Sequence, residues 1–132
     1  MTASPLVVVV DDDPGMRWAV DALIRSLDYR TALFSSAEDF LSSAIMSECH
    51  CLISDVNMGG MDGFEMVSKL TVDAAGERLP PTILISAYTT PKMAETAKLM
   101  GAMVLLKKPF DAENLISYVE RAVSKRGGGE LA

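Results

Sequence analysis

Five short apolar runs of the kind found in β-strands alternate with segments of helical periodicity, and this alternation constrains the fold more than any other feature of the chain. The first run, Leu6–Val10, is a leucine followed by four valines, which is typical of a strand buried on both faces. The other runs lie at residues 30–34, 51–54, 82–86 and 103–107. Strict strand–helix alternation predicts an α/β fold, a doubly wound five-stranded parallel sheet with helices on both faces. Periodicity alone leaves the order of the strands open.

Local signals predict where the helices begin and end. Asp13 followed by Pro14 is typical of an N-cap and a first helical residue. Ser35 to Glu38 has the spacing of a capping box, which predicts a helix that continues to about Met46. The remaining helices are expected at residues 64–70, 91–100 (ended by Gly101) and 112–125 (capped by Asp111).

The composition indicates one acidic domain. The chain has 132 residues, and its 12 basic and 18 acidic residues give a net charge of −6, which is a poor basis for binding nucleic acid. No apolar run approaches the roughly 18–20 residues of a membrane helix, and the N-terminus lacks the pattern of a signal peptide, so we expect a cytoplasmic domain without membrane contact. Residues 1–126 are predicted to form the domain, and the glycine-rich residues 127–132 a flexible tail or the start of a linker.

The two cysteines are expected to be small core residues. Cys49 and Cys51 are separated by one residue, and such neighbours point to opposite faces of a strand. A disulfide between them is therefore not expected, and a reducing compartment fits this pair.

Acidic, hydroxyl and basic residues stand where the predicted strands end. Asp11 and Asp12 follow the first strand, Asp55 the third, Ser86 closes the fourth, and Lys108 follows the fifth. The carboxyl ends of parallel strands share one edge, and open α/β sheets bind their ligands there. We therefore expect these side chains to lie close together.

A cluster of three carboxylates needs a cation. Two carboxylates about 4 Å apart repel by roughly 4 kcal/mol at an effective dielectric near 20. Ligands that are all oxygens suit Mg²⁺, or alternatively Mn²⁺. A divalent ion and Lys108 around one aspartate would let that carboxylate accept a phosphoryl group as a nucleophile, with Ser86 placed to hydrogen-bond a transferred oxygen.

Each of these residues has a plainer interpretation when it is considered alone. A single aspartate after a strand is more often a helix cap or a turn residue, and Asp13 is expected to be only the cap before Pro14. Asp62-Gly63 is expected to be a turn, and the nine methionines core filler. The combination of acids, hydroxyl and lysine at four strand ends favours phosphoryl transfer.

Four stretches of the sequence resemble the receiver domain of response regulators, the phosphoacceptor module of two-component signalling and of chemotaxis regulators. They are VVVVDDDPGMR (7–17), LISDVNMGGMDGFE (52–65), ILISA (83–87) and KKPF (107–110). These stretches fall in register from about Leu6 to Val123. The resemblance implies a flavodoxin-like sheet with strand order 2-1-3-4-5.

The resemblance also implies a role for each residue of the cluster. Asp55 would be the phosphoacceptor, Asp12 a direct ligand of Mg²⁺, and Asp11 a ligand through water or hydrogen bonds. The backbone carbonyl of Asn57 would complete the metal site, Ser86 would be the switch hydroxyl, and Lys108 would contact the phosphate. The Lys108-Pro109 bond is expected to be cis.

The function implied is that of a regulated switch and not of an enzyme that turns over free substrates. A histidine kinase or a phosphotransfer protein would donate the phosphoryl group. Phosphorylation would then change the surface formed by the fourth helix, fifth strand and fifth helix. That surface would bind an output domain, a partner protein or a second copy of the chain, and nucleic acid would not bind to this domain directly.

Two departures from the family pattern leave alternatives open. Gly59-Gly60 follows Met58 where the family usually has a proline, and Leu105 stands where the family has its switch aromatic. Methionine, leucine or the nearby Tyr88 would have to replace that ring, or the coupling is weak. A degenerate receiver that serves only as an interaction module is one alternative. Another is a small phosphatase of the haloacid-dehalogenase type, although that class has a second aspartate where this chain has Asn57.

Overall fold

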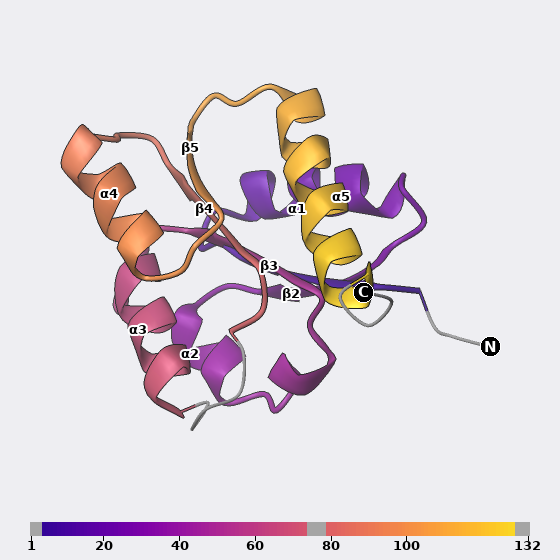
Figure 1. Ribbon diagram of the computed structural model, residues 1–132, viewed down its shortest axis with the longest axis horizontal. Helices are drawn as coiled ribbons and strands as arrows, with labels where there is room; N and C mark the ends of the chain where they lie inside the picture. The colour runs from indigo at the N-terminus through magenta and orange to yellow at the C-terminus, as the bar shows by residue number, and fades with distance from the viewer. Residues whose placement is uncertain (1–3, 74–78, 129–132) are drawn as a thin grey trace.

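The strands form one five-stranded parallel sheet with the order β2-β1-β3-β4-β5, as the resemblance implied (Figure 1). The computed structural model describes residues 4–73 and 79–128 of the chain. All four strand pairings are parallel. The strands are β1 (Leu6–Val10), β2 (Arg30–Phe34), β3 (Cys51–Asp55), β4 (Thr82–Ser86) and β5 (Val104–Lys107).

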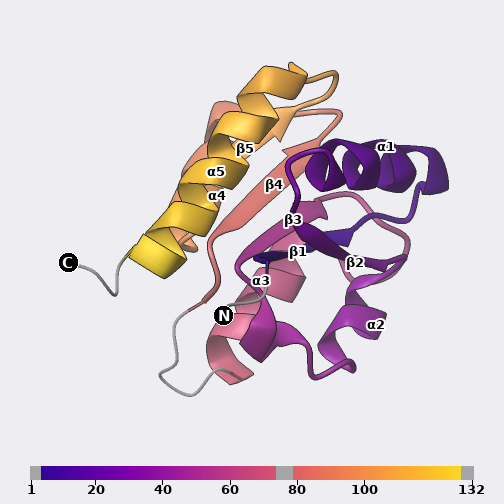
Figure 2. The ribbon, with the colours of Figure 1, turned by 90° about the vertical axis from the view of Figure 1, so that its right-hand side faces the viewer.

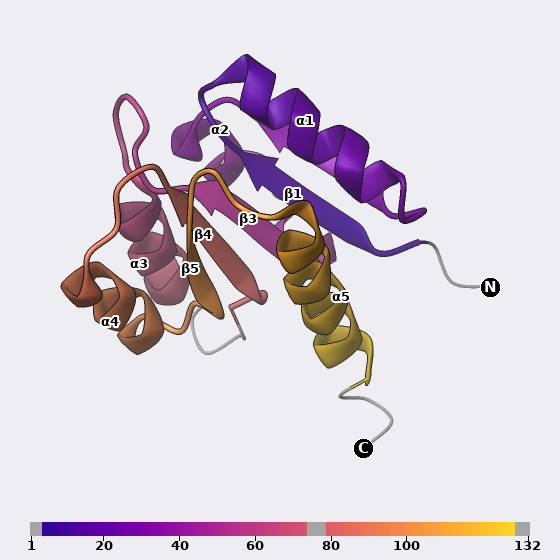
Figure 3. The same cartoon turned by 90° about the horizontal axis from the view of Figure 1, so that it is seen from above.

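Helices cover both faces of the sheet, as Figures 2 and 3 show. Residues of α1 and α5 pack on one face, and residues of α2, α3 and α4 pack on the other. Within the described ranges, no helix has the length and apolar character needed to cross a bilayer. The helices are α1 (Pro14–Arg25), α2 (Ala37–Leu41), α3 (Gly63–Asp73), α4 (Pro91–Leu99) and α5 (Ala112–Gly128), with a short 3₁₀ helix, η1 (Met46–Glu48), after α2.

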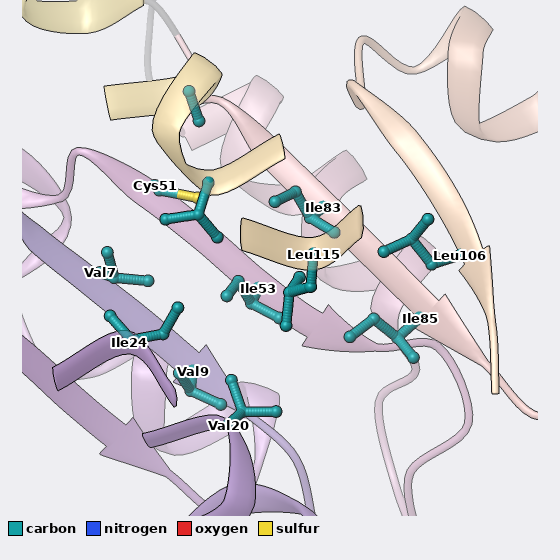
Figure 4. Close-up of a cluster of buried hydrophobic side chains, with 12 residues drawn as sticks. Val7, Val9, Val20, Ile24, Cys51, Ile53, Ile83, Ile85, Leu106 and Leu115 are labelled. Atoms are coloured by element: carbon teal, nitrogen blue, oxygen red, sulfur yellow. The ribbon is translucent and has the colours of Figure 1, made fainter. Parts of the chain in front are cut away.

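The apolar run of β1 explains why helices cover both faces of the sheet. Val7 and Val9 belong to the core beneath α1 and α5 (Figure 4), whereas Val8 and Val10 belong to the core beneath α2 and α3. All four valines are buried. Burial of such a side chain stabilises a fold by about 1.5–3 kcal/mol, so both faces of this strand contribute. Cys49 and Cys51 are likewise buried, as predicted, and no disulfide joins them.

The register of the sheet brings the functional strand ends to one level. Val10 of β1 pairs with Ser54 of β3, so Asp11 follows its strand at the level of Asp55. On the far side of β3, Ser86 at the end of β4 pairs with the last residue of β5. One edge of the sheet therefore carries the acids, the hydroxyl and the lysine.

The first helix begins as its sequence predicts, and the second differs. Asp13 accepts a hydrogen bond from the Gly15 amide at 3.0 Å and caps α1. The cap of α2 is Ser36 rather than Ser35, and its hydroxyl accepts from the Asp39 amide at 3.1 Å.

The second helix is also shorter than predicted, ending at Leu41 instead of near Met46. The Ser42 and Ser43 hydroxyls donate to carbonyl oxygens in the preceding turn, at 2.9 and 2.6 Å, and Ala44 has a φ of 57°. Serine hydroxyls compete with the helical ladder in this way, and a left-handed residue ends it.

The third helix is longer than predicted, and Asp62 does more than occupy a turn. The Asp62 carboxylate accepts from the Glu65 amide at 2.8 Å, and the Glu65 carboxylate accepts from the Asp62 amide at 3.1 Å. This reciprocal pair is a capping box.

Smaller differences concern other boundaries of the predicted elements. The third helix continues to Asp73, β5 begins one residue later than predicted, and α5 continues to Gly128 instead of ending near Lys125. Residues 74–78, between the third helix and the fourth strand, and residues 129–132 of the predicted tail lie outside the described residues. Residues 127 and 128, predicted as part of the tail, are the last two of α5, and the assignment of the remaining glycine-rich end as a tail or linker stays a prediction.

Gly63 begins α3 where the helix comes closest to the end of β3, and this contact leads to a prediction. A Cβ at residue 63 would lie 2.7 Å from the Asp55 carbonyl oxygen, whereas a Cβ at Gly59 would meet nothing within 4 Å. We expect Gly63→Ala to lower the free energy of unfolding by about 1–3 kcal/mol, because backbone atoms must shift. Gly59→Ala, the matched control, should change it by less than about 1 kcal/mol. Urea denaturation measures both values, and equal effects would contradict the close packing of α3 on β3.

Candidate functional site

Three carboxylates meet at the carboxyl edge of β1 and β3. One carboxylate oxygen from each of Asp11, Asp12 and Asp55 lies within 4.8 Å of the other two. Asp11 and Asp55 are only 4% and 6% exposed, whereas Asp12 is exposed to solvent. Residues that are more than forty positions apart in the chain are therefore neighbours, as predicted from the parallel sheet.

Lys108 supplies the cation of this cluster. Its Nζ lies 3.2 Å from Asp55 Oδ2 and 3.7 Å from Asp11 Oδ2. The residue follows β5 directly, and its peptide bond to Pro109 is cis, as expected. Three carboxylates and one ammonium group leave a formal charge of −2, which matches one divalent cation.

Backbone amides hold the two buried carboxylates in place. The Asp13 amide donates to Asp11 Oδ1 at 2.9 Å, and the Asn57 amide donates to Asp55 Oδ1 at 3.3 Å. The Arg17 guanidinium donates to the Asp11 carbonyl oxygen at 2.6 Å, so the first turn of α1 also fixes this loop. Reasoning from the sequence did not identify Arg17, because its partner is a backbone atom that only the fold brings near.

Burial raises the pKa of Asp11 above its usual value. Desolvation is the largest cause, and the negative charges of Asp55 and Asp12 act in the same direction. The hydrogen bond from the Asp13 amide and the charge of Lys108 oppose these effects without cancelling them. The metal-free site therefore resists holding Asp11 in its charged form.

The loop after β3 is fixed to two other parts of the chain. The Gly59 amide donates to Asp12 Oδ2 at 3.0 Å, and the Met61 amide donates to Glu38 Oε2 at 3.2 Å. Gly60 between them has a φ of 97°, a conformation that favours glycine. Glu38 lies on α2, and the sequence pattern predicted that it belongs to a capping box. Its contact with the loop after β3 was not predicted, because the two segments are neighbours only in the folded chain.

Ser86 lies at the same edge, but its hydroxyl is engaged elsewhere. The side chain is fully buried, and its Oγ donates to the Tyr88 carbonyl oxygen at 2.6 Å. The same Oγ accepts from Asn57 Nδ2 at 3.1 Å and from the Tyr88 amide at 3.2 Å. In the part of the chain that the structure describes, Ser86 makes no hydrogen bond to Asp55.

The donor set fits a divalent cation that prefers oxygen ligands. The three acids offer only carboxylate oxygens, and two of them are buried beside a single lysine. Mg²⁺ and Mn²⁺ favour this chemistry, whereas Zn²⁺ sites are usually built from nitrogen and sulfur ligands.

Comparison with known proteins supports the same identification. Residues 7–120 match the response regulator receiver domain family. The transcriptional regulatory protein FixJ of Bradyrhizobium diazoefficiens is 30% identical over 123 residues, which is 93% of this chain and 58% of FixJ. The response regulator protein TmoT of Ectopseudomonas mendocina is 36% identical over 118 residues, covering 89% of this chain and 52% of TmoT.

The fold of this chain is similar to a solved structure over nearly the whole length of that structure. The chemotaxis protein CheY4 of Vibrio cholerae is 28% identical with a TM-score of 0.81, covering 91% of this chain and 99% of that one. The chain spans a little more than half the length of FixJ and TmoT. The match of residues 7–120 to the family, together with the acidic cluster at the ends of β1 and β3, shows that the chain belongs to the response regulator receiver domain family.

Proposed function

We propose that this receiver domain accepts a phosphoryl group on Asp55 from the phosphohistidine of a histidine kinase or a phosphotransfer protein. One observation carries the proposal: the Asp55 carboxylate is buried between Lys108 and the acids Asp11 and Asp12. A carboxylate placed in this way can attack phosphorus while positive charge nearby balances the phosphoryl oxygens.

The transfer forms one bond and breaks another. A carboxylate oxygen of Asp55 attacks the phosphorus atom, and the bond between phosphorus and the donor's imidazole nitrogen breaks. The electron pair of that bond returns to the imidazole, which leaves as the free histidine side chain. The product is an acyl phosphate at the end of β3.

The metal would be held by Asp12, Asp11 and Asp55, with the backbone carbonyl of Asn57 as a further ligand. When bound, Mg²⁺ or Mn²⁺ neutralises negative charge on the phosphoryl oxygens. Asp11 and Asp12 hold their carboxylates at the site through amide hydrogen bonds from Asp13 and Gly59.

Lys108 and Ser86 would take up the remaining charge and hydrogen-bonding capacity of the phosphoryl group. Lys108 Nζ already lies 3.2 Å from Asp55 Oδ2, so it can follow an oxygen of the new phosphate. Ser86 has to redirect its hydroxyl from the Tyr88 carbonyl to a phosphoryl oxygen. That movement would begin the conformational response.

The output surface would be formed by α4, β5 and α5. Met93, Met100 and Leu105 are partly buried and pack against the apolar cluster that contains Ala97 of α4, and Leu99 of the same helix is exposed. On α5, the Arg121 guanidinium lies 5.0 Å from the ring centroid of Tyr118. An output domain, a partner protein or a second copy of the chain would bind this surface after phosphorylation.

A phosphatase of the haloacid-dehalogenase type needs a general acid, and this chain has Asn57 at that position. The family is a signalling module and not a turnover enzyme. Asn57 occupies the position of the acid in that class, and its side chain donates to Ser86. The degenerate-receiver alternative requires that the assembled site fails to take up phosphate, which the next experiment measures directly.

We expect the protein to incorporate phosphate from acetyl phosphate in the presence of Mg²⁺. Asp55→Asn should abolish incorporation because the amide is not a nucleophile toward phosphorus. Phosphate-affinity electrophoresis measures the modified fraction. Asp28→Asn, the same change at an exposed aspartate in the turn after α1, is the matched control and should label like the wild type. Stable labelling of Asp55→Asn would overturn the assignment, and no labelling of the wild type would favour the degenerate receiver.

We also expect Mg²⁺ to stabilise the fold. At ten times its dissociation constant, an ion that binds only the folded state adds about 1.4 kcal/mol to the free energy of unfolding. Asp12→Asn should require a higher Mg²⁺ concentration for the same gain, whereas Asp28→Asn should not. Thermal denaturation over an Mg²⁺ series measures the effect, and an equal response of all three proteins would contradict the site.

A third expectation concerns pH. Since the pKa of Asp11 is raised in the folded protein, stability is lost as the pH rises from the pKa of the unfolded chain to that of the folded protein, and the full cost is present above the folded value. Without metal, Asp11→Asn should therefore raise the free energy of unfolding at pH 7. The gain should shrink as the pH falls and disappear below the pKa of the unfolded chain. Urea denaturation in EDTA from pH 3 to pH 7 tests this, and a variant less stable than wild type at pH 7 would contradict it.

A further inference from the structure

We infer that the Asn57 side chain is a positioning residue that holds the Ser86 hydroxyl on the backbone of Tyr88 in the unphosphorylated protein. This inference rests on the proposed function, in which Ser86 meets the phosphoryl oxygen. For this to happen, the hydrogen bond from Ser86 to the Tyr88 carbonyl has to open. The chain has Leu105 in place of the usual switch aromatic, so we consider this polar contact instead.

The Ser86 hydroxyl has no spare hydrogen-bonding capacity. A hydroxyl has one proton to donate and two lone pairs to accept with. The proton goes to the Tyr88 carbonyl at 2.6 Å, and the two lone pairs accept from Asn57 Nδ2 and from the Tyr88 amide. Because the amide of Asn57 occupies one lone pair, the proton is directed to Tyr88.

The two bonds available to that proton exclude each other. To hydrogen-bond a phosphoryl oxygen on Asp55, Ser86 must withdraw its proton from the Tyr88 carbonyl. Ser86 is a buried strand residue, whereas Tyr88 lies in the loop between β4 and α4 and is 69% exposed. Little packing is therefore lost when Tyr88 moves, and the movement passes along the loop toward α4.

Asn57 joins the phosphoacceptor to this contact directly. Its backbone amide donates to Asp55 Oδ1 at 3.3 Å, while its side chain donates to Ser86 at 3.1 Å. A change at the Asp55 carboxylate therefore reaches Ser86 through one residue. The contact is polar and lies at the edge of the sheet, whereas Leu105 is packed against the apolar cluster beneath α4.

Exchange of the Tyr88 amide with solvent tests this contact. In metal-free, unphosphorylated protein, we expect Asn57→Ala to accelerate exchange of the Tyr88 amide roughly fivefold, the factor that loss of one ordinary hydrogen bond gives. Ser86→Ala should accelerate it at least as much. Adding Asn57→Ala to Ser86→Ala should then change nothing further, because Asn57 acts through the hydroxyl. Magnetisation-transfer NMR measures all four proteins.

Two controls make the result specific. Asn114→Ala, at an exposed asparagine on α5, should leave the Tyr88 amide unchanged. The amides of β4 report in the same spectra that each variant is folded. Unchanged exchange in Asn57→Ala would overturn the inference, and so would equal acceleration with and without Ser86. Since no phosphate donor is present, either failure leaves the assignment of Asp55 intact, which the labelling experiment tests separately.

Discussion

The repulsion among three carboxylates at one edge of the sheet is the interaction on which the rest of the site depends. Asp11 and Asp55 are buried together, and one lysine contacts both of them. Each buried charge would be costly without a partner. The free energy for gathering them comes from elsewhere, from valines, isoleucines and leucines buried on both faces of the sheet. The apolar core thus offsets the cost of gathering like charges at this edge.

The parallel topology explains how such distant residues come together. All strands run in the same direction, so the last residues of every strand lie at one edge of the sheet. The intervening helices return the chain to the opposite edge, where the next strand begins. Gly63 lets α3 start against the end of β3, and the loop between them is tied to Asp12 and Glu38. The flexibility that Gly59-Gly60 would bring to this loop is therefore offset by two carboxylates.

Much of the architecture could be predicted because the local signals and the tertiary packing agree. The valine run of β1 and the Asp13-Pro14 helix start were predicted from residue patterns, and the strand order from the resemblance; the structure confirms all three. The end of α2 was predicted wrongly, since apolar periodicity could not show that serine hydroxyls would compete for its carbonyls.

Hydrogen bonds that side chains make outside their own helix, strand or loop could not be predicted at all. Glu38, Arg17 and the Asn57 amide group each bond an atom that only the folded chain brings near. The residue types at the strand ends indicated which groups meet, but not which of their hydrogen bonds are already in use. Ser86 shows the difference: its position was predicted, but not that its hydroxyl already donates to the Tyr88 carbonyl.

The most direct test of the central claim is to locate the acyl phosphate chemically. After reaction with acetyl phosphate and Mg²⁺, borohydride reduces a phosphorylated aspartate to homoserine, which peptide mass spectrometry can place in the sequence. We expect homoserine at position 55 alone, and none when the metal is removed with EDTA. Homoserine at position 11 or 12, or the same yield at position 55 without metal, would contradict it.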